Sequence, residues 1–413
     1  MLAKIITIGD ELLIGQVVDT NSAWMAQQLN LQGIRIDDII SISDTHAAIT
    51  QAVDRALQTA DLVLITGGLG PTKDDITKKA LADYFGVGME FHTPTYERIL
   101  RLFERWGREP TEAHRDQCFM PANIQILPNK KGTAPGMWFE HNKKVLVSMP
   151  GVPREMKYLM EYEVLPRLDE HFPKLPIHHR TILTVGDGES RIAKRIESVE
   201  ENLPEGLKLA FLPGLGQVRL RLTAIGHDED RLKQMLDDQV KAIEALIPEL
   251  IYGYGQQKLE EVVGQMLLDR QKSLCTAESC TGGYLSHKLT SIPGSSAYFK
   301  GGVIAYDNAV KQSQLAVAAT TLESEGAVSQ QTVIEMVKGA LRLMETDVAV
   351  AISGIAGPGG GTPDKPVGTI WLAVGDAREV KTQKLQLGKD RLGNIQYTSV
   401  QALNMIRKFL LAQ

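Results

Sequence analysis

The sequence is poor in cysteine and has no long apolar segment, and each shortage excludes a class of protein. Three cysteines in 413 residues cannot build a disulfide framework, and their spacing is unlike that of a zinc site. No run reaches the roughly 18 apolar residues that a membrane helix needs. Residues 1–25 include Asp10 and Glu11 and lack the layout of a secretion signal. We therefore expect a cytoplasmic protein that does not contact a membrane.

Positive and negative side chains are also nearly balanced in number, which limits the kinds of molecule that the protein is expected to bind. The chain carries 45 Lys and Arg against 50 Asp and Glu, a net charge of −5. This balance argues against a general nucleic-acid coat. Hydrophobic residues make up 43% of the chain, which excludes wholesale disorder. At about 150 residues per domain, the length predicts two or three domains.

The order of apolar and polar segments predicts three regions. Residues 1–172 alternate short apolar strands with amphipathic helices, which is typical of an α/β domain with a parallel sheet. Asn21 is expected to cap a helix that runs to about Gln32. A proline-rich linker then leads to a small α+β module at 177–252, with the order β-α-β-β-α. Residues 255–413 again predict an α/β domain.

A glycine-rich loop follows a buried strand of the first region. It contains Gly67, Gly68 and Gly70, and Thr72 precedes a predicted helix. Glycines let backbone N–H groups approach an anion closely, and a helix N-terminus adds partial positive charge. Thr72 can cap this helix or donate to a phosphate. The loop therefore predicts a phosphate site, although its spacing matches neither the dinucleotide fingerprint nor the P-loop.

Four carboxylates accompany this loop. Asp74 and Asp75 would repel a phosphate unless a divalent metal such as Mg²⁺ bridges them. Alternatively, they are first-turn residues favoured by the helix dipole. Asp10 and Glu11 directly follow the first strand. Since ligands bind at the carboxyl ends of strands in such sheets, we expect both loops at one edge.

The third region offers three adjacent nucleophiles, which are Ser279, Cys280 and Thr281. A hydroxyl nucleophile needs a base. His287 lies eight residues beyond Ser279 in the same predicted helix, so a Ser-His-Asp triad is poorly supported. Lys311, beyond a strand expected to run beside the first, can serve as the base if burial lowers its pKa. Alternatively, Ser279 caps a helix and Lys311 is solvated.

Other residues of this region suit a ligand. Tyr306 can relay a proton or orient a substrate. A loop of five glycines and two prolines follows the apolar strand at 348–353, and such a loop can wrap backbone around an anionic or flat ligand. Arg391 follows the last strand and can pair with a phosphate. The N–H groups near 281–283, at a helix start, are expected to stabilise an oxyanion.

These motifs together resemble the CinA family over nearly the whole chain. The resemblance rests on Ala277-Glu-Ser-Cys-Thr-Gly-Gly283, the segment 301–311, Gly326-Ala-Val-Ser329 and Ser353-Gly-Ile-Ala-Gly-Pro358. It implies a C-terminal α/β amidase domain that hydrolyses nicotinamide mononucleotide to nicotinic acid mononucleotide and ammonia, without a metal. Ser279 would be the nucleophile, Lys311 its base and Tyr306 a supporting donor. The substrate would contact Cys280, Thr281, Gly282, Gly283, Ser353, Gly354, Gly357 and Arg391.

In the first region, Gly9-Asp-Glu-Leu12, Gly67-Gly-Leu-Gly-Pro-Thr-Lys-Asp-Asp75 and Pro150-Gly-Val-Pro-Arg-Glu155 resemble the molybdopterin-binding MoaB/MogA-like fold in its CinA version. This resemblance implies a metal-dependent pyrophosphatase that acts on ADP-ribose. By position, phosphate would meet Gly67, Gly68, Gly70 and Thr72. The candidate metal ligands would be Asp10, Glu11, Asp74 and Asp75.

The middle module resembles the KH-like module that CinA proteins carry. RNA-binding KH modules use a Gly-x-x-Gly loop, which is missing here. Residues 177–252 hold 10 Lys and Arg against 13 Asp and Glu, a net charge of −3, so nucleic acid is not an expected partner. Three alternatives stay open: a non-catalytic, pterin- or nucleotide-binding first domain, a competence-linked interaction scaffold, and Cys280 as the nucleophile. We expect a homodimer, because symmetric dimers are common.

Overall fold

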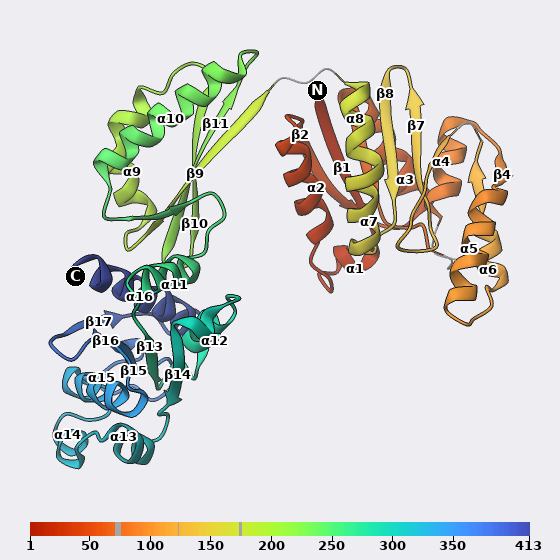
Figure 1. The fold of residues 1–413 in the computed structure, drawn as a ribbon. Helices are drawn as coiled ribbons and strands as arrows, with labels where there is room; N and C mark the ends of the chain where they lie inside the picture. The colour runs from red at the N-terminus through yellow and green to blue at the C-terminus, as the bar shows by residue number, and fades with distance from the viewer. Residues whose placement is uncertain (71–75, 123, 173–175) are drawn as a thin grey trace. The chain divides into compact units, whose positions relative to one another are not determined.

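The computed structural model describes residues 1–70, 76–122, 124–172 and 176–413 (Figure 1). The chain divides into two compact units. The first comprises Met1–His178 with Ile225–Glu229, and the second His179–Ala224 with Asp230–Gln413. The predicted α/β architecture with a small middle module is confirmed. In the part of the chain that is described, no helix combines the length and apolar character needed to cross a membrane.

The first unit is built on a six-stranded mixed sheet with the order β2-β1-β3-β8-β7-β6. The first four strands of this order are parallel, and β7 runs antiparallel to both of its neighbours. In chain order the strands are β1 (Leu2–Ile8), β2 (Arg35–Ile42), β3 (Leu62–Thr66), β6 (Gln125–Leu127), β7 (Gly136–His141) and β8 (Lys144–Met149). A separate antiparallel pair is formed by β4 (Met89–Phe91) and β5 (Phe119–Pro121).

Helices cover both faces of this sheet, because successive side chains of a strand point to opposite sides. On β1, Ala3 and Ile5 pack in one apolar core with residues of α2 and α7, whereas Ile6 and Ile8 pack in another with residues of α3 and α4. The helices of this unit are α1 (Asp10–Leu13), α2 (Thr20–Leu31), α3 (His46–Thr59), α4 (Thr77–Phe85), α5 (Thr93–Arg105), α6 (Glu112–Asp116), α7 (Pro153–Leu159), the π-helix η1 (Met160–Val164) and α8 (Leu165–His171).

One predicted cap in this unit is wrong. The side chain of Asp19, not that of Asn21, accepts a hydrogen bond from the Ser22 N–H at 3.0 Å at the start of α2. The Asn21 amide instead donates to the backbone oxygen of Gly151 at 2.7 Å. A contact between residues 130 positions apart therefore decides which of two suitable residues caps the helix.

The KH-like module forms the first part of the second unit. Its sheet has the order β10-β11-β9-β12, and both helices pack on one apolar core. The elements are β9 (Ile177–Val185), α9 (Glu189–Glu201), β10 (Leu207–Gly214), β11 (Gln217–Ile225), α10 (Glu229–Leu246) and β12 (Ile251–Tyr254). The predicted β-α-β-β-α order is confirmed. The fourth strand, β12, comes from the segment expected to be a domain boundary, and it pairs antiparallel with β9.

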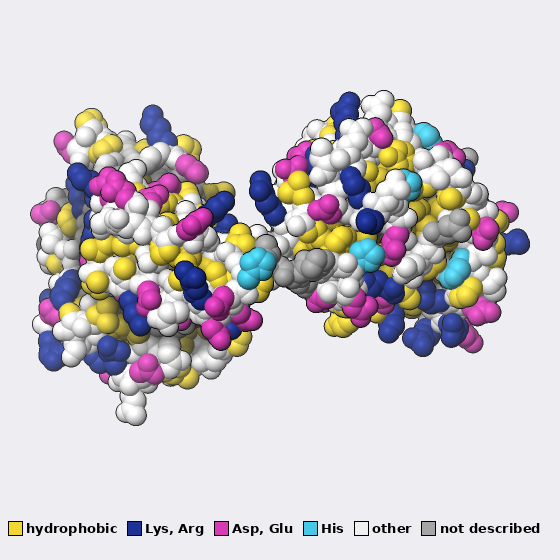
Figure 2. Space-filling model, turned by 90° about the horizontal axis from the view of Figure 1, so that it is seen from above, with side chains coloured by type: hydrophobic (Ala, Val, Ile, Leu, Met, Phe, Trp, Pro, Cys, Tyr) yellow, Lys and Arg dark blue, Asp and Glu magenta, His cyan; other side chains and the backbone are white. Residues whose placement is uncertain are grey.

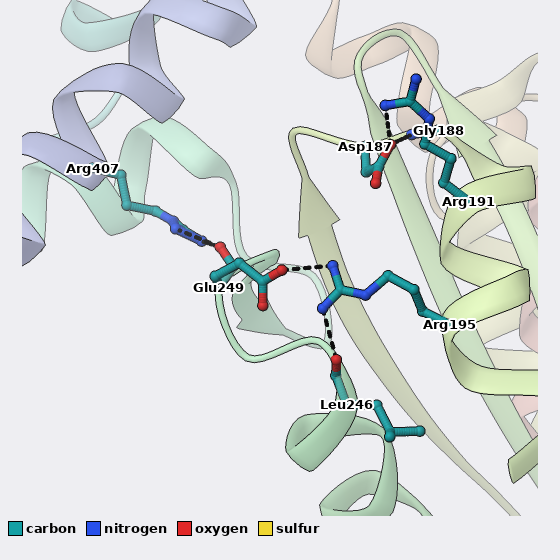
Figure 3. Close-up of polar contacts among 7 residues, drawn as sticks. All are labelled: Asp187, Gly188, Arg191, Arg195, Leu246, Glu249 and Arg407. Atoms are coloured by element: carbon teal, nitrogen blue, oxygen red, sulfur yellow. Dashed lines mark hydrogen bonds and ion pairs between the residues drawn. The ribbon is translucent and has the colours of Figure 1, made fainter. Parts of the chain in front are cut away.

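A buried arginine ties this module to the C-terminal domain. The guanidinium of Arg407 donates to the backbone oxygen of Glu249 at 2.8 Å and of Ile251 at 3.0 Å. Figure 3 shows the bond from Arg407 to Glu249 beside the ion pair between the Glu249 carboxylate and Arg195, in which nitrogen and oxygen are 2.6 Å apart. A further pair in the same view joins Asp187 to Arg191 at the start of α9. The two modules of the second unit thus share polar contacts as well as apolar packing.

The C-terminal domain contains a five-stranded sheet with the order β14-β13-β15-β16-β17. The strands β14, β13 and β15 are parallel, and β16 and β17 are antiparallel. In chain order they are β13 (Leu274–Glu278), β14 (Phe299–Ile304), β15 (Val348–Gly354), β16 (Thr369–Gly375) and β17 (Val380–Gln386). The predicted pairing of the strand before Ser279 with the strand before Lys311 is confirmed.

Two apolar cores sandwich this sheet. One contains α11, α12 and α16, and the other contains α13 and α15 (Figure 1). The helices are α11 (Leu259–Asp269), α12 (Tyr284–Thr290), the 3₁₀ turn η2 (Ser295–Ala297), α13 (Asn308–Leu315), α14 (Ala319–Ser324), α15 (Gln330–Met344) and α16 (Arg391–Leu411). On the surface drawn in Figure 2, acidic and basic side chains intermingle over much of both units, in line with the small net charge.

Candidate active site

The nucleophile candidates lie where the parallel strands of the C-terminal sheet end. Ser279 directly follows β13, and its N–H donates to the backbone oxygen of Ile352 on β15 at 2.9 Å. The residue is only 7% exposed. This backbone bond fixes the start of the loop that carries the serine against the neighbouring strand.

Lys311 reaches this serine from α13. Its Nζ lies 3.2 Å from the Ser279 Oγ, 2.8 Å from the backbone oxygen of Ala305 and 3.3 Å from that of Tyr306. The helix begins after Asp307, whose side chain accepts from the Ala309 N–H. Lys311 is 1% exposed, so the alternative that it is a solvated surface residue is wrong.

Burial lowers the pKa of Lys311, because a charged ammonium loses its hydration there, while Asp307 and Cys280 act in the opposite direction. Among the described residues, no carboxylate lies within ion-pair distance of its Nζ. A neutral amine has two hydrogens and one lone pair. As an ammonium, Nζ donates to the Ser279 Oγ as well as to the two carbonyl oxygens; in the neutral form, its two hydrogens serve the carbonyls and its lone pair can accept the hydroxyl hydrogen of Ser279.

Cys280 and Thr281 are less suitable nucleophiles. Burial raises the pKa of the Cys280 thiol to about 12, which keeps the sulfur protonated at neutral pH. The Thr281 hydroxyl is buried without a hydrogen-bond partner among the described residues. His287 lies exposed on α12, where its ring packs near that of Tyr284, and among the described residues it forms no hydrogen bond with Ser279. Of the three candidates, only Ser279 contacts a base.

A cavity of about 280 Å³ opens in front of the serine and lysine. Tyr306 and Arg391 line it together, and the Arg391 guanidinium donates to the Tyr306 hydroxyl at 3.0 Å and to the Gly357 backbone oxygen at 2.9 Å. Tyr306 is 60% exposed, so it stands at the mouth rather than beside the Ser279 hydroxyl. The remaining lining includes Cys280, Ala327, Val328, Ser353, Gly354, Ile355 and Gly357.

Ser353 supports the wall of this cavity. Its hydroxyl donates to the backbone oxygen of Ala327 at 2.6 Å and so joins β15 to the segment before α15. Asn308 also lines the cavity, from the exposed first position of α13. The sequence analysis missed Asn308, although its place three residues before the candidate base was a usable signal.

The N–H groups at the start of α12 are arranged differently from expectation. The Gly282 N–H donates to the Ser279 backbone oxygen at 3.0 Å, and the Gly283 N–H donates to the Glu278 carboxylate at 3.1 Å. Neither group is free for a substrate. Ser279 does not cap the helix either, because Gly283 occupies the N-cap position with a φ of 95°. That conformation is in the region that strongly favours glycine.

The phosphate loop of the first unit lies at the corresponding edge of its sheet. Gly67 follows β3, and a Cβ atom added to it would stand 2.2 Å from the backbone oxygen of Ile8 at the end of β1. The Gly67 φ of 118° also disfavours any side chain. Gly68 packs as closely on Thr77, and Gly70 ends the described part of the loop.

Two further residues support this loop and were missed by the sequence analysis. The Thr66 hydroxyl donates to the Pro150 backbone oxygen at 2.9 Å, and the Asn21 amide nitrogen binds the next carbonyl at Gly151. The Asn21 side-chain oxygen is buried without a partner among the described residues. The motif that begins at Pro150 therefore lies beside Gly67, a neighbourhood that the sequence analysis did not predict.

The predicted metal ligands are only partly visible. Asp10 and Glu11 are exposed at the start of α1, after β1. Thr72, Asp74 and Asp75 lie outside the described residues. Within the described ranges, no group of three or more His, Cys, Asp or Glu residues is arranged to hold a metal ion. Asp10 and Glu11 do not make a metal site by themselves.

The sequence matches three known domain families. These are a "probable molybdopterin binding domain" at 4–170, the "damage-inducible protein CinA KH domain" at 179–253 and the "CinA C-terminal domain" at 256–410.

Full-length relatives agree. The CinA-like protein of Cytophaga hutchinsonii is 43% identical over 408 residues, which cover 99% of this chain and 98% of the relative. The CinA-like protein of Chloroherpeton thalassium is 43% identical over 418 residues, with 99% of each chain covered. The crystal structure of competence/damage inducible protein CihA from Agrobacterium tumefaciens is 37% identical, with 37% of this chain and 96% of that chain covered and a TM-score of 0.35. The chain belongs to the CinA family.

Proposed function

We propose that the C-terminal domain hydrolyses the carboxamide of nicotinamide mononucleotide, with Ser279 as the nucleophile and Lys311 as its base. One observation carries this proposal: a lysine that is 1% exposed places its Nζ 3.2 Å from the hydroxyl of Ser279 in front of a cavity. Burial lowers the pKa of this amine, and the neutral form of the amine can accept the hydroxyl proton, which a solvated lysine does poorly.

The reaction then follows from these two groups. The Ser279 Oγ attacks the carboxamide carbon while its proton moves to the Lys311 Nζ. The resulting ammonium returns this proton to the leaving nitrogen, the C–N bond breaks and ammonia departs, which leaves an ester on Ser279. Lys311 next takes a proton from water, the hydroxide attacks the ester carbon, and the proton returns to the serine oxygen as the acid leaves.

The cavity residues suit the rest of such a substrate. Arg391 and Tyr306 hydrogen-bond to each other at the mouth, and Asn308 faces the same space. A guanidinium and an amide there can bind the phosphate and ribose oxygens of a mononucleotide. The volume of about 280 Å³ suits a ligand of that size better than a polymer.

Ammonia release tests this proposal. The purified full chain is incubated with nicotinamide mononucleotide in the presence of EDTA, and ammonia and nicotinic acid mononucleotide are measured together. We expect equal amounts of both products, because no step above uses a metal. The absence of both products would contradict the proposed activity.

For the first unit, we propose a metal-dependent pyrophosphatase that acts on ADP-ribose. The supporting observation is the junction of Gly67 and Gly151 with the Asn21 side-chain oxygen, which has no partner in the described part of the chain, at the carboxyl edge of the sheet. Since Asp10 and Glu11 alone do not form a metal site, we derive no catalytic step through a metal. The proposed ligands also include Asp74 and Asp75, outside the described residues.

Substitution separates this activity from simple binding. The double variant Asp74→Asn/Asp75→Asn should lose Mg²⁺-dependent cleavage of ADP-ribose while it keeps amidase activity. Retained cleavage would contradict the metal assignment. If the wild type binds ADP-ribose and never cleaves it, the non-catalytic alternative is correct instead. A competence-linked scaffold finds less support, because the KH-like module is acidic, and salt-sensitive binding of RNA or DNA would revive it.

A further inference from the structure

The carboxylate of Glu278, directly before the nucleophile, accepts four hydrogen bonds. Glu278 is the last residue of β13 and is 0% exposed. One carboxylate oxygen accepts from the N–H groups of Gly283 and Leu285, each at 3.1 Å. The other accepts from the N–H of Ser286 at 2.8 Å and from its hydroxyl at 2.6 Å. All four donors belong to the start of α12.

No cation offsets this charge. Among the described residues, no Lys, Arg or His forms an ion pair with Glu278. An ionised carboxylate buried without a counter-ion is costly, and only its hydrogen bonds compensate for the lost hydration. A serine or asparagine could cap a helix of this length at a smaller cost. The cap alone therefore gives little reason for an acid at this position.

The bonds of Glu278 decide which N–H groups remain for a substrate. The loop from Ser279 to Gly283 is fixed at one end by the bond from the Ser279 N–H to Ile352 and at the other by the bond from Gly283 to Glu278. Within the loop, the Gly282 N–H donates to the Ser279 oxygen. Apart from a contact between the Cys280 N–H and its own sulfur, the N–H groups of Cys280 and Thr281 have no acceptor among the described residues, and Cys280 lines the cavity.

We propose that Glu278 is a positioning residue that holds the nucleophile loop so that the N–H groups of Cys280 and Thr281 form the oxyanion hole. This inference rests on the proposed amidase function. Backbone N–H groups adjacent to a nucleophile stabilise the negative oxygen of a tetrahedral intermediate if the loop keeps them in place. Glu278 occupies the competing donors of α12 and anchors the loop without contact to the substrate.

The test compares Glu278→Gln with a matched control, Glu260→Gln. Glu260 is another buried acid of the domain, 7% exposed, and its carboxylate pairs with Lys288 at 3.0 Å without lining the cavity. Glutamine at 278 places an NH₂ group against backbone donors and so displaces the loop. We expect kcat for nicotinamide mononucleotide to fall about 10²-fold, as for a displacement of about 1 Å, with KM within about threefold. The control should keep kcat within about threefold of wild type.

Some outcomes would overturn the proposal. A Glu278→Gln variant with kcat within threefold of wild type would do so, as would a rise in KM with unchanged kcat. If Glu278→Gln does not fold, Glu278→Asp keeps the charge and shortens the reach. This variant should still lower kcat at constant KM, and wild-type kcat in it would count against the positioning role.

A covalent probe separates this proposal from the failure of the amidase function. A fluorophosphonate reacts with an activated serine: the Ser279 oxygen bonds to phosphorus, fluoride leaves and Lys311 takes the proton. Intact-mass measurements should show labelling of the wild type and not of Ser279→Ala, and labelling about 10²-fold slower in Glu278→Gln. Slowed labelling without ammonia release would refute the amide substrate and keep the positioning role. Equal labelling rates, or no labelling of the wild type, would refute that role.

Discussion

Replacement of Lys311 is the perturbation whose effect follows most directly from the structure. The Nζ atom contacts Ser279, Ala305 and Tyr306 and nothing charged among the described residues. At its ordinary pKa of 10.5, about one lysine in 10³ would be neutral at pH 7.5. Each unit by which burial lowers the pKa increases this fraction about tenfold. The site therefore contains a larger fraction of neutral amine than a solvated lysine would supply.

Loss of the base should be correspondingly large. Lys311→Met fills a similar volume without an amine, and Lys311→Arg keeps the donors but cannot deprotonate. A general base contributes about 10²- to 10⁴-fold, so we expect both variants to lose about 10³-fold in kcat/KM for nicotinamide mononucleotide. Stopped assays of ammonia, paired with thermal melts, check that the loss is not due to unfolding.

The pH profile supplies the second half of this test. Because Lys311 acts when neutral, wild-type kcat/KM should fall as the pH drops below the pKa of Lys311. Since burial lowers this pKa, the midpoint of the fall should lie at a pH below 10.5. Either variant within tenfold of wild type, or a wild-type profile with no such fall, would refute the assignment of Lys311 as the base.

Three other predictions follow from the remaining contacts. Cys280→Ala should keep kcat/KM within about threefold, and iodoacetamide should not inactivate the native enzyme, because a thiol with a pKa of about 12 is ionised in only about one molecule in 3 × 10⁴ at pH 7.5. Inactivation by alkylation at Cys280 would contradict this. Arg407→Ala should cost the second unit about 2–4 kcal/mol in urea unfolding, because the buried Arg407 side chain and its bonds to the backbone oxygens of Glu249 and Ile251 are lost. Arg195→Ala removes an exposed partner of Glu249 and should leave the urea midpoint of unfolding unchanged. Equal losses of stability in the Arg407 and Arg195 variants would contradict the special role of the buried arginine. Gly67→Ala should destabilise the first unit by about 2–3 kcal/mol and leave ammonia release unaffected, since its Cβ would overlap the Ile8 oxygen.

Much of the site could be predicted because its parts follow apolar strands. The run before Ser279 and the run before Lys311 are short and apolar, so a parallel sheet brings their carboxyl ends together. The residue types then indicated a serine and a lysine in reach of each other. The burial of Lys311 could be stated only as a condition, because it depends on helices packed from elsewhere in the chain.

What the sequence did not reveal depends on long-range hydrogen bonds. Nothing in the local pattern distinguishes Asp19 from Asn21 as a cap, and the carbonyl of Gly151 decides it. Likewise, α12 begins at Tyr284, later than expected, so the N–H groups near its start are taken by Glu278. The apolar run up to Ala277 predicts a strand that ends before Glu278, whereas β13 includes this residue, and the pattern does not identify the donors that satisfy its carboxylate.

The central claim is a serine amidase that needs no metal, and a comparison of two variants tests it most directly. Ammonia release from nicotinamide mononucleotide is measured with EDTA for wild type, Ser279→Ala and Cys280→Ala. The account predicts activity in wild type and Cys280→Ala, and a loss of at least about 10³-fold in Ser279→Ala. Retained activity in Ser279→Ala, or its loss only in Cys280→Ala, would contradict the account.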